Sequence, residues 1–424
     1  MADSGNPRRA STVVFTYPSY RLYQTARFFI VLATEMQSVA VGWQVYEITK
    51  RPLDLGLVGL AQFLPGILLF LVSGYTADRF DRRRVLTIGY AGFAVCSGLL
   101  LAMDLRGIRS VHAIWAVVAL VGVVRSFNGP ASRAIMPLLV PEELFQSAFA
   151  WGATLFQGAT VLGPAAGGLI YAIFRGPAAV YAMSTLTALC AALSMLGVIP
   201  QFRPRPREPF SARSVAAGMR YIWREKIVLG SITLDMFAVL LGGAVYLLPA
   251  YAHDILNAGP LALGLLRCAP AIGASAMATL LAIRPLGGKA GAKMFWCVVG
   301  FSVSTIVFGL SRNMVLSMIA LIFVGATDMV SVVIRGILIQ LATPNEMRGR
   351  VTAVDMIFIG TSNELGGFES GVTAQKFGTV AAVVLGGVGS LVVTAICAAL
   401  FPGLRTADQL PTTETQAKVP APLG

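Results

Sequence analysis

The sequence predicts an all-α polytopic membrane protein in which 12 transmembrane helices form two six-helix bundles that repeat in the same orientation. Composition is the first observation: of 424 residues, 56% are hydrophobic and 12% are charged, whereas a soluble domain averages about 45–50% and about 25%. The second is a series of apolar runs, each long enough to cross a bilayer. The third is an internal repeat that relates the two halves of the chain.

The apolar runs divide the chain into two blocks of six spans. We expect a cytoplasmic segment at 1–21, a first bundle at 22–200, a basic cytoplasmic linker at 201–226, a second bundle at 227–401 and a flexible cytoplasmic tail at 402–424. The end of the linker has the composition of a short interfacial helix. The predicted spans are 22–46, 53–77, 85–103, 113–137, 145–173, 178–198, 227–250, 261–283, 294–310, 315–341, 353–375 and 380–400.

Three motifs recur at an offset of 203 residues. Because this offset covers six helices, an even number, the two copies share one orientation and are related by an axis along the membrane normal. The aligned pairs are Gly122–Arg125 with Gly325–Asp328, Pro141–Leu144 with Pro344–Met347, and Leu162–Gly168 with Leu365–Gly371.

Lysine and arginine outnumber aspartate and glutamate by 33 to 20, a net charge of +13, which in a soluble protein suggests a polyanionic partner. Their distribution instead indicates orientation. With both termini in the cytoplasm, 22 of the 33 basic residues fall in cytoplasmic segments and seven on the opposite side. Because basic residues accumulate in cytoplasmic loops, we expect a multi-pass protein of the bacterial cytoplasmic (inner) membrane. Its partner is then the lipid bilayer and not a nucleic acid.

The sequence carries no pattern typical of an enzyme or of a cofactor protein. The five cysteines lie in apolar stretches with no CxxC and no His/Cys cluster, so neither a disulfide framework nor a metal site is predicted. No P-loop is present, and no nucleophile, base and metal ligands converge in the sequence. We therefore expect no catalytic residue, no metal and no cofactor.

The loop after the second predicted span carries the most specific motif. It reads GYTADRFDRRR from residue 74 and resembles the G-x-x-x-D-R-x-G-R-R signature of the major facilitator superfamily, with Asp81 where that family usually has glycine. The resemblance implies the major facilitator fold and a latch that stabilises one conformation. Glycine lets helices approach closely, aspartate can face a helix N-terminus and arginine can pair with carboxylates. The latch residues are Gly74, Asp78, Arg79, Arg82 and Arg83.

Two further motifs resemble those of the same superfamily. RSFNG at residues 125–129 is similar to R-x-x-Q-G, which is implicated in proton coupling, with asparagine in place of glutamine. GPAAGG at residues 163–168 matches the core of a signature associated with exporters. Segments such as LLPAYAHDIL and NELGGFESG resemble the transmembrane secretion effector branch, which contains the enterobactin exporter. This resemblance implies export. The exporter signature residues are Gly163, Pro164, Gly167 and Gly168.

Charged residues within the spans are the candidates for chemistry, because each costs about 2.5–3.5 kcal/mol at a helix centre on insertion scales. Burial favours the protonated form of a carboxyl group and a nearby arginine favours the anion. Glu35 and Asp235 are the leading candidates for carrying a proton, with Arg125 modulating one of them. A fixed ion pair or a strut between helices is the competing interpretation. Further candidates for the proton-coupling or substrate cavity are Gln37, Gln62, Asn128, Asp328 and Arg335.

Asp328 and Arg335 are seven residues apart, which is too far for direct pairing within one helix. We expect each of them to have a partner on another element.

Together these features predict a proton-coupled exporter of a small amphipathic organic molecule, siderophore-like or drug-like, that works as a monomer by alternating access. One alternative is a proton-coupled importer of a small metabolite, which transport in inverted vesicles would distinguish by direction. A second is a non-transporting membrane sensor or scaffold. Loss of flux in Glu35→Gln, with normal expression, would argue against that alternative.

Overall fold

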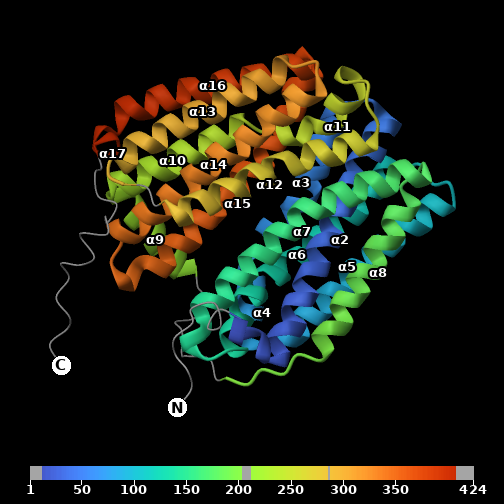
Figure 1. Cartoon of the computed structure of the whole chain (residues 1–424), viewed down its shortest axis with the longest axis horizontal. Coiled ribbons are helices and arrows are strands. Elements are labelled where there is room, and N and C mark those ends of the chain that lie inside the picture. The colour runs from blue at the N-terminus through green and yellow to red at the C-terminus, as the bar shows by residue number, and fades with distance from the viewer. Residues whose placement is uncertain (1–11, 203–211, 285–286, 407–424) are drawn as a thin grey trace. The chain divides into compact units, whose positions relative to one another are not determined.

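The computed structural model describes residues 12–202, 212–284 and 287–406, without the side chains of residues 70, 71, 77, 78, 212 and 213. Every regular element in these ranges is a helix (Figure 1). Ten of the described helices are long and apolar enough to cross a membrane. The predicted class, an all-α multi-pass membrane protein, is confirmed.

The count of ten differs from the predicted 12 at two places. The second predicted span is divided into α3 (Pro52–Leu68) and α4 (Phe70–Arg79). Pro65 lies inside α3 and has no N–H to donate, so the helix is weakened just before the break. The eleventh predicted span is α15 (Asn345–Phe377), which is long enough but carries charged residues along its length.

The chain forms two compact units, Met1–Ser211 with Ala252–Cys268 (unit 1) and Ala212–Tyr251 with Ala269–Gly424 (unit 2). The segment 252–268, which the sequence analysis assigns to the second bundle, groups with unit 1. The helix α12 (Pro260–Ile283) begins in this segment. Its residues up to Cys268 therefore belong to unit 1, and its residues from Ala269 onward belong to unit 2.

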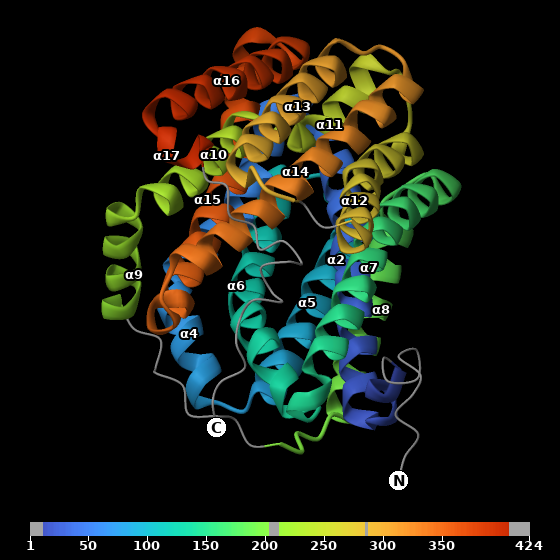
Figure 2. The same ribbon diagram turned by 60° about the vertical axis from the view of Figure 1, so that its left-hand side comes forward.

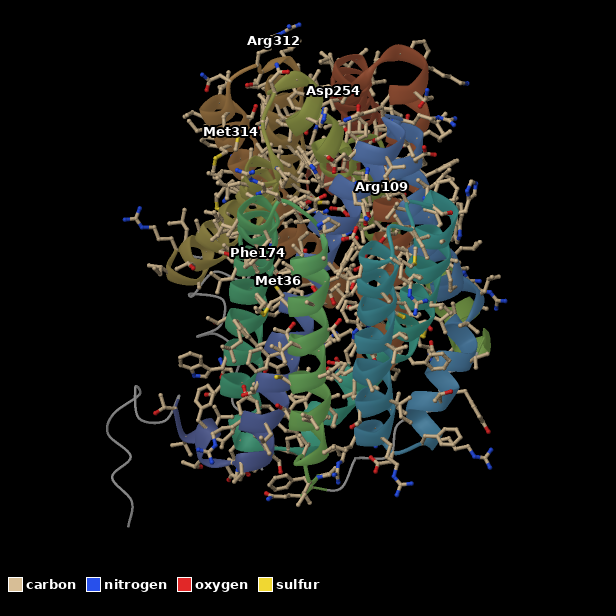
Figure 3. All side chains as sticks on the ribbon, turned by 90° about the vertical axis from the view of Figure 1, so that its right-hand side faces the viewer. Met36, Arg109, Phe174, Asp254, Arg312 and Met314 are labelled. Atoms are coloured by element: carbon tan, nitrogen blue, oxygen red, sulfur yellow. The ribbon has the colours of Figure 1, made fainter. Side chains whose placement is uncertain are left out.

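Unit 1 is built around its first long helix, α2. This helix packs against α7 and α8, α5 packs against α6 and α8, and α3 packs against α6. Figure 3 labels Met36 on α2 and Arg109 in the turn between α5 and α6. The bounds are α2 (Pro18–Thr49), α5 (Arg82–Leu105), α6 (Val111–Ile135), α7 (Phe145–Phe174) and α8 (Ala178–Leu196), with short turns η1 (Val13–Thr16), η2 (Met136–Leu138) and η3 (Glu142–Leu144).

Unit 2 repeats the same pattern of neighbours: α10 packs against α15 and α16, and α13 packs against α14 and α16. A further helix, α9, lies beside α15 (Figure 2). The bounds are α9 (Ala212–Arg224), α10 (Lys226–Leu241), α13 (Ala290–Leu310), α14 (Met314–Ala342), α16 (Thr379–Leu400) and α17 (Pro402–Arg405). The turns that follow α10 are η4 (Ala244–Leu247), α11 (Leu248–Ala250) and η5 (Tyr251–Ile255).

The internal repeat is visible in two equivalent close contacts. A Cβ atom on Gly122 of α6 would lie 2.1 Å from the carbonyl oxygen of Gln62 on α3, and one on Gly325 of α14 would lie 1.9 Å from that of Pro270 on α12. Only glycine permits such an approach, since real Cβ atoms do not come this close to backbone. Each repeat therefore crosses its second and fourth helices at a glycine in the same position of the repeat.

The seventh predicted span is interrupted after α10. Gly242 ends the helix, and a Cβ atom on Gly243 would lie 2.7 Å from the carbonyl oxygen of Gly366 on α15. The two adjacent glycines weaken the helix and allow the backbones of α10 and α15 to approach. The chain continues through short turns to Ile255.

Candidate functional site

Three helices of unit 2 bring opposite charges together. Asp235 lies on α10, Arg335 on α14 and Asp355 on α15. Nη1 of Arg335 forms an ion pair with Oδ2 of Asp235 and lies 3.7 Å from Oδ1 of Asp355. Asp235 is 4% exposed, Arg335 3% and Asp355 9%. The pair of Asp235 and Arg335 is thus withdrawn from solvent, and a second carboxyl group lies within ion-pair distance of the same guanidinium.

The sequence of α14 places further polar groups on the face that carries Arg335. Asp328, Ser331 and Arg335 are spaced by three and four residues, which puts them on one side of a helix. Ser331 donates a hydrogen bond from Oγ to Oδ1 of Asp235 over 3.4 Å. We refer to Arg335, Asp235, Asp328, Asp355 and Ser331 as the Arg335 cluster.

A small cavity opens between Asp235 and Asp328. Ser331 and Thr327 also line it, and Phe301 of α13 contributes an apolar wall. Its volume of about 10 Å³ is near the minimum that one water molecule needs. Asp328 is half-buried there. Two carboxyl groups therefore face a space in which a water molecule could pass a proton between them.

The charges of the Arg335 cluster do not balance when all its carboxyl groups are ionised. Its guanidinium keeps its charge at any pH a protein experiences, whereas Asp235, Asp328 and Asp355 together would carry three negative charges. Buried charge that lacks a counter-charge is costly, and a carboxyl group can remove it by taking up a proton. The arrangement is therefore suited to binding and releasing protons.

The position of each cluster residue along its helix gives its distance from one end of that helix. Asp235 is nine residues from the start of α10, Arg335 seven from the end of α14, and Asp355 ten from the start of α15. At 1.5 Å per residue these positions lie roughly 10–15 Å from the helix ends. Asp328 precedes Arg335 by seven residues in α14 and therefore lies about 10 Å further from the end of that helix. The carboxyl groups are thus staggered along the axis of unit 2.

Glu35 and Arg125, two charged candidates of unit 1, are not joined to each other. Glu35 is half-buried on α2, and Arg125 is exposed on α6. Neither side chain forms a hydrogen bond or ion pair with any residue in 12–202 or in the rest of the described chain. A Cβ atom on Gly163 of α7 would lie 2.4 Å from Cβ of Glu35, so α2 and α7 are in close contact at this carboxyl group.

The three amide candidates occupy different surroundings. Gln37 is buried and accepts a hydrogen bond from Oγ of Ser97, which joins α2 to α5. Asn128 packs against Gly89 of α5, and its buried Oδ1 has no hydrogen-bond partner in the described part of the chain. Gln62 is half-buried, and its backbone carbonyl is the one that Gly122 contacts. Gln37 thus acts as a strut, while Asn128 retains an unsatisfied acceptor.

The loop after α4 is ordered by local contacts. Asp81 caps α5 by accepting a hydrogen bond from the backbone N–H of Arg83 over 3.0 Å, and its φ of −60° is one that any residue adopts. Asp81 therefore fits this turn, although the major facilitator signature usually has glycine at this position. The guanidinium of Arg83 donates to the carbonyls of Met195, over 3.3 Å, and of Leu196 at the end of α8.

The other latch residues contribute less to these contacts. Arg79 donates to the hydroxyl of Tyr75 within α4, and Gly74 is buried. Nε of Arg82 is buried without a hydrogen-bond partner among the described residues. The side chain of Asp78 lies outside the described part of the structure.

The exporter-like glycines of α7 are contact points between helices. A Cβ atom on Gly167 would lie 2.9 Å from Cα of Met36 on α2, and one on Gly168 would lie 2.6 Å from the carbonyl oxygen of Pro260 on α12. On α12, a Cβ atom on Gly264 would lie 2.5 Å from the carbonyl oxygen of Pro164. The motif lets α7 approach α2 on one side and the start of α12 on another.

Asp355 is the member of the cluster that the sequence analysis missed. It lies near the start of a predicted span, where a charge is easily read as an interfacial residue. A signal was present, since Asp355 is a lone carboxylate within the apolar run VTAVDMIFI.

The family model described as transmembrane secretion effector matches residues 12–423, nearly the whole chain. The chain belongs to the transmembrane secretion effectors. This confirms the resemblance to that branch of the major facilitator superfamily, which the loop and glycine motifs indicated. The protein is a membrane transporter of the major facilitator type and not an enzyme.

Named relatives match nearly the full length of the chain. The enterobactin exporter EntS of Shigella boydii serotype 4 (strain Sb227) is 26% identical over 407 residues, which cover 93% of this chain and 95% of the relative. EntS of Escherichia coli O81 (strain ED1a) gives the same identity and coverage. A mutant of the nucleoside transporter NupG has a TM-score of 0.73 at 11% identity, covering 90% of this chain and 100% of that one.

A bacterial homologue of the iron transporter ferroportin, in an inward-facing state, has a TM-score of 0.68 at 16% identity. The aligned residues cover 95% of this chain and 100% of the ferroportin homologue. At 11% and 16% identity, the similarity between this chain and these two solved structures is a similarity of fold.

Proposed function

We propose that this protein is a proton-coupled exporter of a small amphipathic organic molecule, siderophore-like or drug-like, in the bacterial cytoplasmic membrane. It works as a monomer by alternating access, with both termini in the cytoplasm. The observation that carries the proposal is the Arg335 cluster, in which one buried guanidinium is shared by carboxyl groups from α10 and α15 beside a third on α14. The family and the printed name of its relatives favour export.

The cluster suggests how a proton is coupled to a change of shape. With Asp235 ionised, Arg335 pairs with it and ties α14 to α10. A proton arriving at Asp235 by way of Asp328 and the small cavity removes that charge. Arg335 then pairs with Asp355 on α15, which already lies 3.7 Å away. Release of the proton restores the first pair, so each proton moves the guanidinium between two helices.

Cargo contact is assigned to the polar residues of unit 1. Glu35 and Arg125 are charged side chains of spanning helices that have no ion pair within the described residues, and charges in that position are usually functional. Asn128 and Gln62 supply amide groups on the neighbouring helices. Gly74, Asp78, Arg79, Arg82 and Arg83 are proposed to act as the conformational latch, with Arg83 making its contact to α8.

Direction and energy source are tested together. Accumulation of candidate siderophores, antibiotics and dyes is measured in cells with and without the protein and in inverted membrane vesicles, in each case with and without a proton uncoupler. An exporter lowers accumulation in cells and raises it in inverted vesicles, and the uncoupler abolishes both effects. Uptake into intact cells would indicate an importer, and no flux of any tested compound would favour a sensor or scaffold.

A further inference from the structure

The helix α9 is fastened to unit 2 by one face. A Cβ atom on Gly218 would lie 2.7 Å from the backbone oxygen of Arg350 on α15. The hydroxyl of Tyr221 donates to the carbonyl of Ala342 at the end of α14. Ile222 is 1% exposed and packs in a core with Val351 and Val354 of α15. This face therefore holds α9 against the point where α14 passes into α15.

The opposite face carries two arginines and a tryptophan. Arg220, Trp223 and Arg224 are spaced by three and one residues, so they share one side of the helix, and all three are exposed, Trp223 by 63%. Neither guanidinium makes an ion pair or hydrogen bond with any described residue. The exposed indole of Trp223 therefore lies on the same side of α9 as two arginines that have no counter-charge in the described part of the chain.

The position of α9 indicates what covers this face. It ends at Arg224, and after Glu225 the spanning helix α10 begins at Lys226. Trp223 and Arg224 are thus within three residues of a helix that enters the bilayer. Tryptophan is enriched at the level of lipid headgroups, and basic residues beside a spanning helix attract anionic lipids. Lys226 is also exposed and adds a further positive charge, while Glu225 is half-buried.

We propose that α9 is a binding site for an anionic phospholipid such as phosphatidylglycerol. Arg220 and Arg224 hold the headgroup phosphate, and the Trp223 indole lies at the boundary between headgroups and acyl chains. Since the other face of α9 is docked on α14 and α15, a bound lipid steadies the junction of the two helices that carry Arg335 and Asp355. The site does not depend on what the protein transports.

The test measures lipid binding directly. The full-length chain in detergent is titrated with phosphatidylglycerol and, separately, with phosphatidylcholine, and the bound lipids are counted by native mass spectrometry. The double variant R220Q/R224Q should weaken phosphatidylglycerol binding by on the order of tenfold and leave phosphatidylcholine unchanged. R220K/R224K should retain most of the binding, because the attraction follows the charge.

The matched control is R106Q/R109Q, which removes two exposed arginines from the turn between α5 and α6 and should bind phosphatidylglycerol as the wild type does. Equal loss in both double variants, or no loss in R220Q/R224Q, would overturn the proposal. In a second measurement, brominated phosphatidylglycerol should quench more tryptophan fluorescence in the wild type than in W223F. Equal quenching in the two proteins would contradict a lipid at Trp223.

Discussion

Arg335 and Asp235 depend on each other because neither charge is exposed. An arginine cannot lose its proton, so removal of its partner leaves a positive charge inside the helix bundle. Breaking one side of a buried ion pair typically costs 3–5 kcal/mol, whereas replacing both partners can be nearly neutral. Asp355, 3.7 Å from the same guanidinium, offsets part of that loss.

The first prediction concerns this pair. Asp235→Asn should destabilise the protein by about 3 kcal/mol, near the lower end of that range, and D235N/R335Q should recover most of the loss. Neither variant should couple transport to protons. The measurement is the apparent thermal midpoint in detergent. Glu346→Gln, an exposed carboxylate at the start of α15, is the control and should match the wild type. A double variant no more stable than D235N would show that the two residues are not coupled.

Asp81 gives a second prediction at this scale. Its side chain caps α5, and such a cap contributes about 1 kcal/mol, most of which asparagine retains and alanine loses. We expect Asp81→Ala to lower the thermal midpoint and Asp81→Asn to leave it nearly unchanged. If both substitutions behave alike, the capping hydrogen bond does not stabilise this loop.

At the scale of helices, glycines permit the closest contacts between neighbouring helices. Gly122 and Gly325 each lie against a carbonyl of a neighbouring helix, whereas nothing lies within 4 Å of a Cβ atom built on Gly129 of α6 or on Gly336 of α14. Each close contact therefore has a matched open position on its own helix.

The third prediction follows from these positions. Gly122→Ala and Gly325→Ala should each destabilise the protein by about 1–3 kcal/mol, because the new methyl group overlaps backbone that cannot move alone. Gly129→Ala and Gly336→Ala should be neutral or slightly stabilising, since alanine favours helix. Apparent thermal midpoints of the four variants check this. Similar losses at close and open positions would mean that helix packing is not the cause.

Apolar run length predicted most helices because the bilayer sets their length. The breaks at Leu69 and after Leu241 were not predicted, since the surrounding residues remain apolar and hydropathy does not report backbone geometry. Asp235 was predicted as a candidate from its position in a span. Its pairing with Arg335 was not, because the two are 100 residues apart and an ion pair between helices leaves no trace in local sequence.

At the scale of the whole molecule, the charge distribution predicts sidedness. The fourth prediction is that single cysteines introduced at Ser4 and Thr413 in a cysteine-free background react with a membrane-impermeant maleimide only after the membrane is opened. A cysteine at Ile108, which is exposed in the turn between α5 and α6, should react in intact cells. Reaction of one terminus from outside would contradict an even number of spans.

The most direct test of proton coupling is the proton movement that cargo itself produces. Purified protein in liposomes containing a pH-sensitive dye is exposed to a transported compound without any imposed pH gradient. The wild type and E346Q should change the internal pH when cargo is added, and D235N and D328N should bind cargo but leave the pH unchanged. Cargo-driven proton movement that persists in both aspartate variants would contradict the role assigned to the Arg335 cluster.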